Sequence, residues 1–473
     1  MTSLWGKACL RKCIGTGGAL ESREQVVPQV DPALIRRSII GGAVGVWVHW
    51  FDWAVYAYLA TTLAAVFFPN ENPTAGLLSV FAIFAVSFVV RPLGGFFFGP
   101  LGDKIGRRTT LAVVIITMGA ATTAVGLLPT YSSVGILAPI LLVTVRLVQG
   151  FAAGGEFGGA AAFLAEYSPR RHRGFGVSWL ESSSLLGFLT ASLAVFLLNS
   201  ALTEEAVTAW GWRIPFLIAG PMAVVGLYIR LKLEDTPNFR VLEQTNEVSQ
   251  APLRELLRQD WKQLLQMTGI EILQHVSFYI VLVYLLTYQT QELGLSSGSA
   301  AMLSTITSIV AMVLVPLFGA LSDRVGRKPL LIASGLGFLL LSYPAFLLMR
   351  TGDLGAIILV QTGLGILLAL ILSTHAVAMS EIFPTRVRQA GLSLGYQVTA
   401  AIFAGTVPYL MTYLISATGN PYVPAFYLMF VGLVGVGTTL TLRETAGLPL
   451  PQREPVTPVQ ETAGGAVSGS ESE

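Results

Sequence analysis

Long apolar runs separated by short polar stretches occupy most of the chain. Each run is at least about 20 residues long, the length with which an α-helix crosses a bilayer core about 30 Å thick. Strands of a membrane barrel would be about half as long and would alternate in polarity, which these runs do not. The pattern predicts twelve transmembrane helices. They fall at residues 39–68, 76–101, 109–128, 135–166, 174–199, 211–232, 263–291, 298–321, 329–349, 354–382, 389–416 and 422–442.

The longest polar connection separates six runs from the next six. Within it leucines recur at helical spacing while Arg254, Arg258 and Lys262 fall four residues apart, a pattern typical of a helix at the inner membrane surface. We therefore expect a cytoplasmic tail, a six-helix bundle, a linker with an interfacial helix, a second six-helix bundle and a disordered cytoplasmic tail. These parts cover residues 1–38, 39–232, 233–262, 263–443 and 444–473.

Composition supports a multi-pass membrane protein. Hydrophobic residues make up 53% of the 473 residues, charged residues 12%, and the mean hydropathy is +0.67. A soluble protein has about twice that charged fraction, about 25%. The net charge of +2 gives no sign of a nucleic-acid partner, and the only cysteines, Cys9 and Cys13, cannot form a disulfide framework. We expect the chain to lie in the lipid bilayer and to bind no nucleic acid. The sequence does not indicate which proteins it binds.

Lysine and arginine are placed unevenly along the chain. Of the 29, 25 lie in the two tails and in every second connection between runs, starting with the connection after the second run. Connections rich in these residues stay on the cytoplasmic side. The distribution predicts a protein of the cytoplasmic (cell) membrane with both termini in the cytoplasm.

A basic turn between two apolar runs occurs twice, 220 residues apart. Its copies are Gly99-Pro-Leu-Gly-Asp103-Lys104-Ile-Gly106-Arg107-Arg108 and Gly319-Ala-Leu-Ser-Asp323-Arg324-Val-Gly326-Arg327-Lys328. A cytoplasmic anchor needs only cations, but this turn also repeats an aspartate and two glycines. Both interpretations, an anchor and a gating device, stay open at this point.

A second motif repeats in the same order. Glu166-x-x-Pro169-x-Arg171-x-Arg173-x-x-Gly176 returns 215 residues later as Glu381-x-x-Pro384-x-Arg386-x-Arg388-x-x-Gly391. Two motifs at nearly one offset indicate that the halves are structural copies. Transporters built from such repeats bind solute near mid-membrane, between halves that rock about the site.

The repeated turn resembles the signature of the major facilitator superfamily. Other segments, between about residues 38 and 450, resemble its metabolite:proton symporter branch, and within it the proline/glycine-betaine:proton symporters. They are Phe51-Asp52 with Tyr56, Arg91-Pro92-Leu93-Gly94-Gly95, Gln149-Gly150-Phe151, Gly154-Gly155-Glu156, Ala165-Glu166-Tyr167-Ser168-Pro169, Trp210-Gly211-Trp212-Arg213-Ile214-Pro215-Phe216, Leu321-Ser322-Asp323-Arg324, Pro424-Ala425-Phe426-Tyr427-Leu428-Met429 and Glu444-Thr445-Ala446.

This resemblance implies an all-α, two-domain transporter with twelve helices that couples solute uptake to the proton gradient and needs no cofactor. Asp103 and Asp323 would latch a cytoplasmic gate, since an aspartate gains from a helix N-terminus and from a neighbouring arginine. The implied gate comprises Gly99, Asp103, Gly106, Arg107, Arg108, Glu166, Arg171, Arg173, Asp323, Arg324, Gly326, Arg327, Glu381, Arg386 and Arg388.

Ionisable residues inside membrane helices are costly and mark candidate sites. His49, Asp52 and Tyr56 share one face of the first helix, with Asp52 near mid-membrane. A low-dielectric surrounding favours a protonated carboxyl, which suits Asp52 to carry a proton. The alternative is a structural ion pair with Arg91 of the second helix.

Arg91 and Arg146 are the two arginines inside runs. A guanidinium grips a carboxylate with a bidentate fork, so both are candidates to bind substrate. Alternatively Arg146 pairs permanently with an acid such as Asp52 or Glu156. Direct pairing with Glu156 inside one helix is disfavoured, because ten residues span about 15 Å. Glu156 itself is either structural or proton-carrying.

One face of the seventh helix carries Glu271, Gln274, His275, Phe278 and Tyr279, which predicts a cavity lining. Glu271 is expected near the inner end in a solvated position, with His275 nearer mid-membrane. Tyr279, Tyr284 and Tyr288 would either cage a quaternary ammonium by cation–π attraction or simply pack. Glu181 and His375 are lesser candidates.

Two positions depart from the resembled branch. His49 stands where the related sequences typically carry glutamate, and an imidazole titrates near neutrality. Arg146 is more like the organic-acid members than the proline/betaine members, where lysine is expected. Both departures bear on which substrate is bound.

We expect a proton-coupled symporter, not an enzyme, that takes up a small zwitterion such as proline or betaine. An organic acid of the 2-oxoglutarate, shikimate or citrate type is the alternative substrate. A channel or a membrane-embedded enzyme is the alternative from another class. The chain has no H-E-x-x-H, G-x-S-x-G or P-loop motif, and a channel has no need of a repeated gate.

Overall fold

The computed structural model describes residues 46–69, 72–105, 107–154, 157–231 and 252–451. The expected tail 1–38, most of the linker, Gly106 and Glu156 lie outside these ranges. The side chains of Asp103, Arg107, Arg108, Glu166 and Arg386 also lie outside the described part.

Every predicted apolar run coincides with helical residues. The first half contains a helix at 46–58, then α2 (Ala60–Phe67), α3 (Pro73–Ile105), α4 (Arg107–Leu127), α5 (Tyr131–Val134), α6 (Leu137–Ala153), α7 (Phe157–Tyr167), η1 (Arg170–His172), α8 (Arg173–Ala201), α9 (Glu204–Ala206), η2 (Val207–Gly211) and α10 (Arg213–Leu231).

The second half begins with α12 (Pro252–Gln259). It continues with α13 (Trp261–Phe278), η3 (Tyr279–Tyr284), α14 (Leu285–Gln291), α15 (Ser297–Val325), α16 (Arg327–Met349), α17 (Leu354–Ile382), α18 (Thr385–Thr399), η4 (Ala400–Ala404), α19 (Val407–Thr418) and α20 (Val423–Thr441). The prediction of an all-helical fold is confirmed, since the described ranges contain no strand.

Eight helices in the described part are long and apolar enough to cross a membrane, or nine if the bent pair Glu204–Gly211 and Arg213–Tyr228 is one span. This count supports a multi-pass membrane protein, while the number of twelve crossings stays a prediction. Some runs contain shorter regular helices. The first run breaks at Leu59, and the third and fourth runs hold the shorter apolar helices Ala112–Leu127 and Leu137–Ala153.

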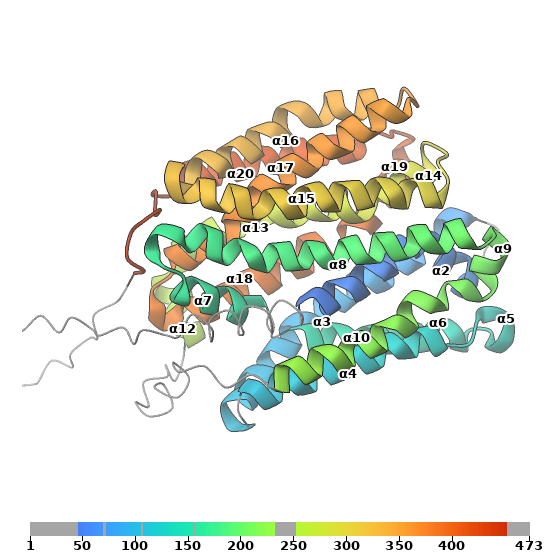
Figure 1. The fold of residues 1–473 in the computed structure, drawn as a ribbon, viewed down its shortest axis with the longest axis horizontal. Coiled ribbons are helices and arrows are strands. Elements are labelled where there is room, and N and C mark those ends of the chain that lie inside the picture. Colours follow the sequence, from blue (N-terminus) through green and yellow to red (C-terminus); the bar gives the residue numbers. More distant parts are fainter. Residues whose placement is uncertain (1–45, 70–71, 106, 155–156, 232–251, 452–473) are drawn as a thin grey trace, which may run out of the picture.

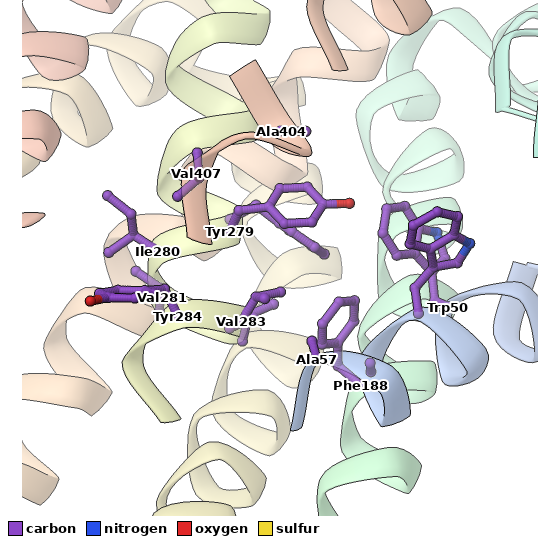
Figure 2. Packing of buried hydrophobic residues seen from close by; sticks show 14 of the residues in the cluster. Trp50, Ala57, Phe188, Tyr279, Ile280, Val281, Val283, Tyr284, Ala404 and Val407 are labelled. Carbon is purple, nitrogen blue, oxygen red and sulfur yellow. The ribbon is translucent and has the colours of Figure 1, made fainter. Parts of the chain in front are cut away.

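The helices form two bundles that meet along α8 and α15 (Figure 1). Helices α3, α4, α6 and α10 pack together on one side, and α13, α16, α17 and α20 on the other. Between the bundles lies an aromatic core, where Phe278 packs 5.3 Å from Trp50 and 5.0 Å from Phe188 between ring centres. Figure 2 shows Trp50 and Phe188 facing the segment around Tyr279.

Close helix packing brings the second and fourth runs together. A Cβ at Gly154 would overlap the carbonyl oxygen of Arg91, so only glycine allows α3 and α6 this approach. The contact fixes the backbone of Arg91 against the helix that carries Arg146. It thereby positions two of the candidate residues.

The linker and the C-terminal tail each show a local difference. Helix α12 exists, but Asp260 separates it from α13, and Leu256 is buried while Leu257, Trp261 and Leu265 remain exposed. The disorder expected from residue 444 is wrong for residues 444–451. There Glu444, Thr445 and Leu448 bind the α8, α16 and α17 ends through polar groups that the apolar pattern does not register.

Candidate functional site

Asp52 lies in a buried polar cluster inside the first half. Its Oδ2 atom is 3.6 Å from Nη1 of Arg146 and accepts a hydrogen bond of 3.0 Å from the Gln149 amide. The same amide donates to Thr122 Oγ1 at 2.9 Å, and Gln149 Oε1 accepts from Arg146 at 2.9 Å. The helix at 46–58, α4 and α6 each contribute, because the apolar environment leaves polar side chains only one another as partners.

Aromatic rings surround both buried arginines. The guanidinium carbon of Arg91 lies 4.1 Å from the ring centre of Trp53 and 3.8 Å from that of Phe88. That of Arg146 lies 4.3 Å from Trp53 and 4.1 Å from Tyr56. Such cation–π contacts contribute about 0.5–2 kcal/mol each and hold the cations without consuming their donors.

Several strong hydrogen-bonding atoms in this cluster have no partner. They are the Nε and Nη2 atoms of Arg91 and Arg146 and the Oδ1 atom of Asp52, all buried. An unpartnered buried donor or acceptor is costly. Two cationic forks and one carboxylate oxygen are therefore free to bind a ligand that carries both signs of charge.

In this structure the partner of Asp52 is Arg146, at 3.6 Å. Within the described residues Asp52 makes no ion pair with Arg91. His49 and Tyr56, which share the helix face with Asp52, make hydrogen bonds to other groups. His49 Nδ1 lies 3.3 Å from Met118 Sδ, and the Tyr56 hydroxyl donates to the Val80 carbonyl at 3.0 Å. Tyr56 thus takes part through its ring only.

A crevice opens beside Asp52 between the helix at 46–58, α4 and α10. Its polar lining is His49, Asp52 and Thr122, and its apolar lining is Val48, Ile115, Met118, Gly119, Ala219 and Gly226. The crevice reaches the carboxylate from inside the first bundle.

Tyr279 approaches the arginine cluster from the second half. Its ring centre lies 5.5 Å from Phe88 and 6.0 Å from Phe84, and its buried hydroxyl has no partner. The predicted tyrosine cage is not formed, because Tyr288 packs against Phe346 and no ring contact joins it to Tyr279 in the described part. The helical rotation between positions 279 and 288 separates their faces.

Glu271 is not solvated as expected; it is fully buried. Its Oε1 atom lies 3.0 Å from Nδ1 of His375, whose Nε2 lies 3.1 Å from Oε1 of Glu181. His275, by contrast, donates from Nδ1 to the backbone carbonyl of Glu271 at 2.8 Å. The sequence showed each of these acids and imidazoles inside an apolar run, but spacing along separate helices could not show that they meet.

The second copy of the repeated turn connects the halves at one end of the bundle. Asp323 accepts hydrogen bonds from the backbone N–H groups of Gly174 at 2.8 Å and Phe175 at 2.9 Å, at the N-terminus of α8. Arg327 Nη1 lies 2.9 Å from the same carboxylate. The aspartate thus caps a helix of the opposite half, a favourable position for a negative charge.

The second repeated motif completes this connection. Glu381 Oε1 accepts from Arg173 at 2.8 Å and from Arg327 at 3.3 Å. Arg388 donates to the Ser380 carbonyl at 2.8 Å, whereas Arg171 and Arg324 are exposed. The structure therefore joins part of the implied gate across the halves, while its gating role stays a prediction.

Glu444 makes a contact with the repeated turn that the sequence interpretation did not assign to it. Its carboxylate accepts from the backbone N–H groups of Arg327 at 2.8 Å and Lys328 at 3.0 Å, the first residues of α16. Gly326 has φ +106°, a conformation that favours glycine, and a Cβ there would clash with Glu444. A carboxylate directly after the last apolar run was the available signal.

Comparisons with known proteins identify the chain's relatives. The sugar (and other) transporter family matches residues 39–260 and 240–456. The glycine betaine/proline/ectoine/pipecolic acid transporter OusA of Dickeya dadantii is 38% identical over 430 residues, which cover 89% of this chain and 86% of that protein. The proline/betaine transporter of Escherichia coli strain K12 is 37% identical with the same coverage.

Solved structures show the same fold at lower sequence identity. The proton:xylose symporter XylE of the major facilitator superfamily, bound to 6-bromo-6-deoxy-D-glucose, superposes with a TM-score of 0.70 at 17% identity, covering 89% of this chain and 98% of that one. An inward-open structure of XylE from E. coli gives 0.67 at 20% identity, covering 88% and 98%. These relatives are transporters, as the sequence predicted. The chain belongs to the sugar (and other) transporter family and has the major facilitator fold.

Proposed function

We propose that the protein is a proton-coupled symporter that imports a small zwitterionic solute of the proline or betaine kind. It works by alternating access in the cytoplasmic membrane, which it crosses twelve times with both termini in the cytoplasm. The observation that carries the proposal is the set of unpartnered atoms at Asp52, Arg91 and Arg146.

A zwitterion matches this set by charge. Its carboxylate would bind the free Nε and Nη2 atoms of the arginines, which present the bidentate fork that carboxylates fit. Its cationic nitrogen would lie against the aromatic rings around them. Relatives named as proline and betaine transporters support the same substrate class.

Asp52 is the proposed carrier of the proton. Its neutral form removes a buried negative charge next to Arg146, which then has a cationic fork free for the substrate carboxylate. Proton and substrate binding are thereby coupled within one cluster. The proton gradient supplies the driving force.

Alternating access requires contacts that form and break between halves. The contacts of Asp323 with α8 and of Glu381 with Arg173 are of this kind, being polar and at one end of the bundle. By the placement of lysine and arginine along the chain, this end faces the cytoplasm. In this arrangement the cytoplasmic gate is closed.

An organic acid is the second candidate substrate. Two arginines face one aspartate in the cluster, so the buried charge is net positive when Asp52 is ionised. A solute with two carboxylates would balance that charge better than a zwitterion. The proposal of a symporter is common to both.

Transport in reconstituted lipid vesicles tests the proposal. With an imposed inward proton gradient, labelled proline or glycine betaine is expected to accumulate, and a protonophore is expected to abolish the accumulation. Accumulation that survives the protonophore for both zwitterions and dicarboxylates would contradict symport. Competition of the labelled solute by a panel of both classes decides between the substrates, with protein-free vesicles as the control.

A further inference from the structure

Glu181, His375 and Glu271 form a buried chain of polar contacts that joins the two halves. Glu181 belongs to α8 of the first half, and the other two belong to α17 and α13 of the second. His375 lies between the carboxylates, 3.1 Å from one and 3.0 Å from the other, and all three side chains are at most 3% exposed. The substrate cluster around Asp52 shares no residue with it.

The two contacts of His375 together require one proton more than a neutral imidazole and two ionised carboxylates supply. Ionised carboxylates only accept hydrogen bonds, and a neutral imidazole has a single N–H. Both ring nitrogens of His375 nevertheless lie at hydrogen-bond distance from carboxylate oxygens. Both contacts are hydrogen bonds only if one more proton is present, on the imidazole or on a carboxyl group.

Other charged groups do not replace that proton. In the part of the chain that the structure describes, neither Glu181 nor Glu271 pairs with a lysine or arginine. The titratable neighbours are His275 of α13 and Tyr396 of α18, while Tyr279 of η3 and Arg91 of α3 act from further away. Arg327 of α16 pairs with Glu381 of α17 and with Asp323 of α15. These contacts lie at Glu381, six residues along α17 from His375.

Aromatic rings close the site on the side of α7 and α18. Phe157 stacks on Tyr396 with ring centres 3.9 Å apart and lies parallel to His375 at 6.2 Å. Phe157 belongs to the first half and Tyr396 to the second. Water is thus kept from the bridge as long as the halves are together, which strengthens its electrostatics.

We propose that Glu181, His375 and Glu271 are a second proton-binding site, whose proton holds the two halves together in this conformation. The inference rests on the proposed function, since it adds a site to a proton-coupled transporter. With the proton bound, His375 donates to both carboxylates. When the proton leaves, one carboxylate faces a nitrogen lone pair, and two buried negative charges share one neutral imidazole.

This loss of a partner links proton release to separation of the halves. A buried carboxylate without a donor is strongly disfavoured, and separation lets water reach it. By linkage, a proton that binds the joined conformation better shifts the population toward it. The joined conformation is therefore favoured at low pH and the separated one at high pH.

The distance between the halves measures this linkage directly. Spin labels at Arg171 and Val325, exposed positions of the first and second half, report it after Cys9 and Cys13 are replaced by serine. In lipid nanodiscs without substrate, we expect the distance distribution to move from short to long between about pH 5 and about pH 10, a range that brackets histidine titration.

Two substitutions test whether the bound proton, and not apolar packing alone, holds the two halves together. H375Q removes the titrating ring and is expected to abolish the pH-dependent shift. E181Q replaces one carboxylate with an amide that can donate to the unprotonated nitrogen of His375, so it is expected to keep the short distance at high pH and to flatten the pH-dependent shift. A short distance in E181Q also shows that the variant is folded.

The matched control is H275Q. His275 is a second imidazole beside Glu271: its Nδ1 lies 3.0 Å from Oε2 of Glu271 and also donates to the Glu271 backbone carbonyl. Its contacts in the described residues stay within the second half, so the pH-dependent shift should remain. A shift in H375Q equal to that of the unsubstituted protein would overturn the proposal. So would a distance in the unsubstituted protein that does not change with pH.

The uptake experiment separates this inference from the proposed function. If the distance shift depends on His375 but uptake in vesicles ignores the proton gradient, the second proton site stands and symport fails. If uptake is proton-driven but the distance ignores His375, symport stands and the second site fails.

Discussion

The cluster around Asp52 draws its polar members from the first half alone, whereas Glu181, His375 and Glu271 take one carboxylate from each half. The first cluster leaves donors and an acceptor unpartnered, and His375 in the second has both nitrogens engaged. One arrangement is ready for a ligand. The other is complete only while the halves are together.

The difference separates two tasks of a coupled transporter. A cluster within one rigid half keeps its geometry when the halves move, so it can bind solute and proton in every conformation. A bridge between halves has a different free energy in each conformation, so whatever binds it biases the conformational equilibrium. Under the proposed function, binding and movement would thus depend on different residues.

Asp52→Asn removes the carboxylate of the one-half cluster and should have the largest effect. We expect proton-driven accumulation in vesicles to fall by about a hundredfold or more, because a positioned proton-transfer group contributes at least about that factor. The spin-label distance should keep its pH dependence. Asp353→Asn is the matched control, since Asp353 only caps α17 at an exposed end. Retained accumulation in D52N would remove Asp52 as the carrier.

Arg146→Lys tests substrate binding in the same cluster. An ammonium lacks the planar fork and the stacking on Trp53 and Tyr56, so the KM for uptake should rise about tenfold, about 1.4 kcal/mol. The measurement is the concentration dependence of uptake, with the exposed Arg170→Lys as the control. An unchanged KM in R146K would exclude a carboxylate contact at this residue.

Asp323→Asn weakens the polar connection between the halves without touching the Asp52 cluster. Hydrogen bonds to a charged group contribute about 1.5–3 kcal/mol, so the separated conformation should become about tenfold more populated. The label distance should lengthen at every pH while KM changes little. Asp353→Asn, at an exposed helix end away from this contact, is expected to behave as the unsubstituted protein. A distance in D323N that stays short would show that Asp323 does not hold the halves.

Glu444→Gln is expected to have the smallest effect, confined to stability. Burial acts to raise the pKa of Glu444, but the N–H groups of Arg327, Ala446, Lys328 and Thr445 together lower it below the usual 4.5. The carboxylate therefore stabilises the folded protein above the unfolded pKa, and this contribution is lost as the pH falls through the lower folded pKa.

Thermal unfolding in detergent at several pH values measures this effect. The Tm of E444Q should lie below that of the unsubstituted protein at neutral pH, and the gap should close on acidification. The exposed Glu204→Gln serves as the control and should show no gap. A gap that persists at acidic pH would mean that shape, not charge, matters at position 444.

Sequence alone determined the helices and their division into two halves. A membrane helix is recognised by a local property, the length of an apolar run, and the described helices fall on the predicted runs. Repeated motifs are also local, and the resemblance they carry to the major facilitator superfamily implied one network for Asp323 and Glu381 before their contacts were known. Asp52, Arg91 and Arg146 stood out because ionisable residues are rare inside such runs.

Only the tertiary structure decided which of these residues meet. Spacing along one helix shows which side chains share a face, but the partner of that face depends on the rotation and depth of another helix. For that reason Asp52 pairs with Arg146 and not with Arg91, Glu271 is buried against His375, and Glu444 caps α16. These pairings form between residues 94 to 117 positions apart (146 − 52 = 94 for the first), where no local pattern constrains them and packing alone selects the contact.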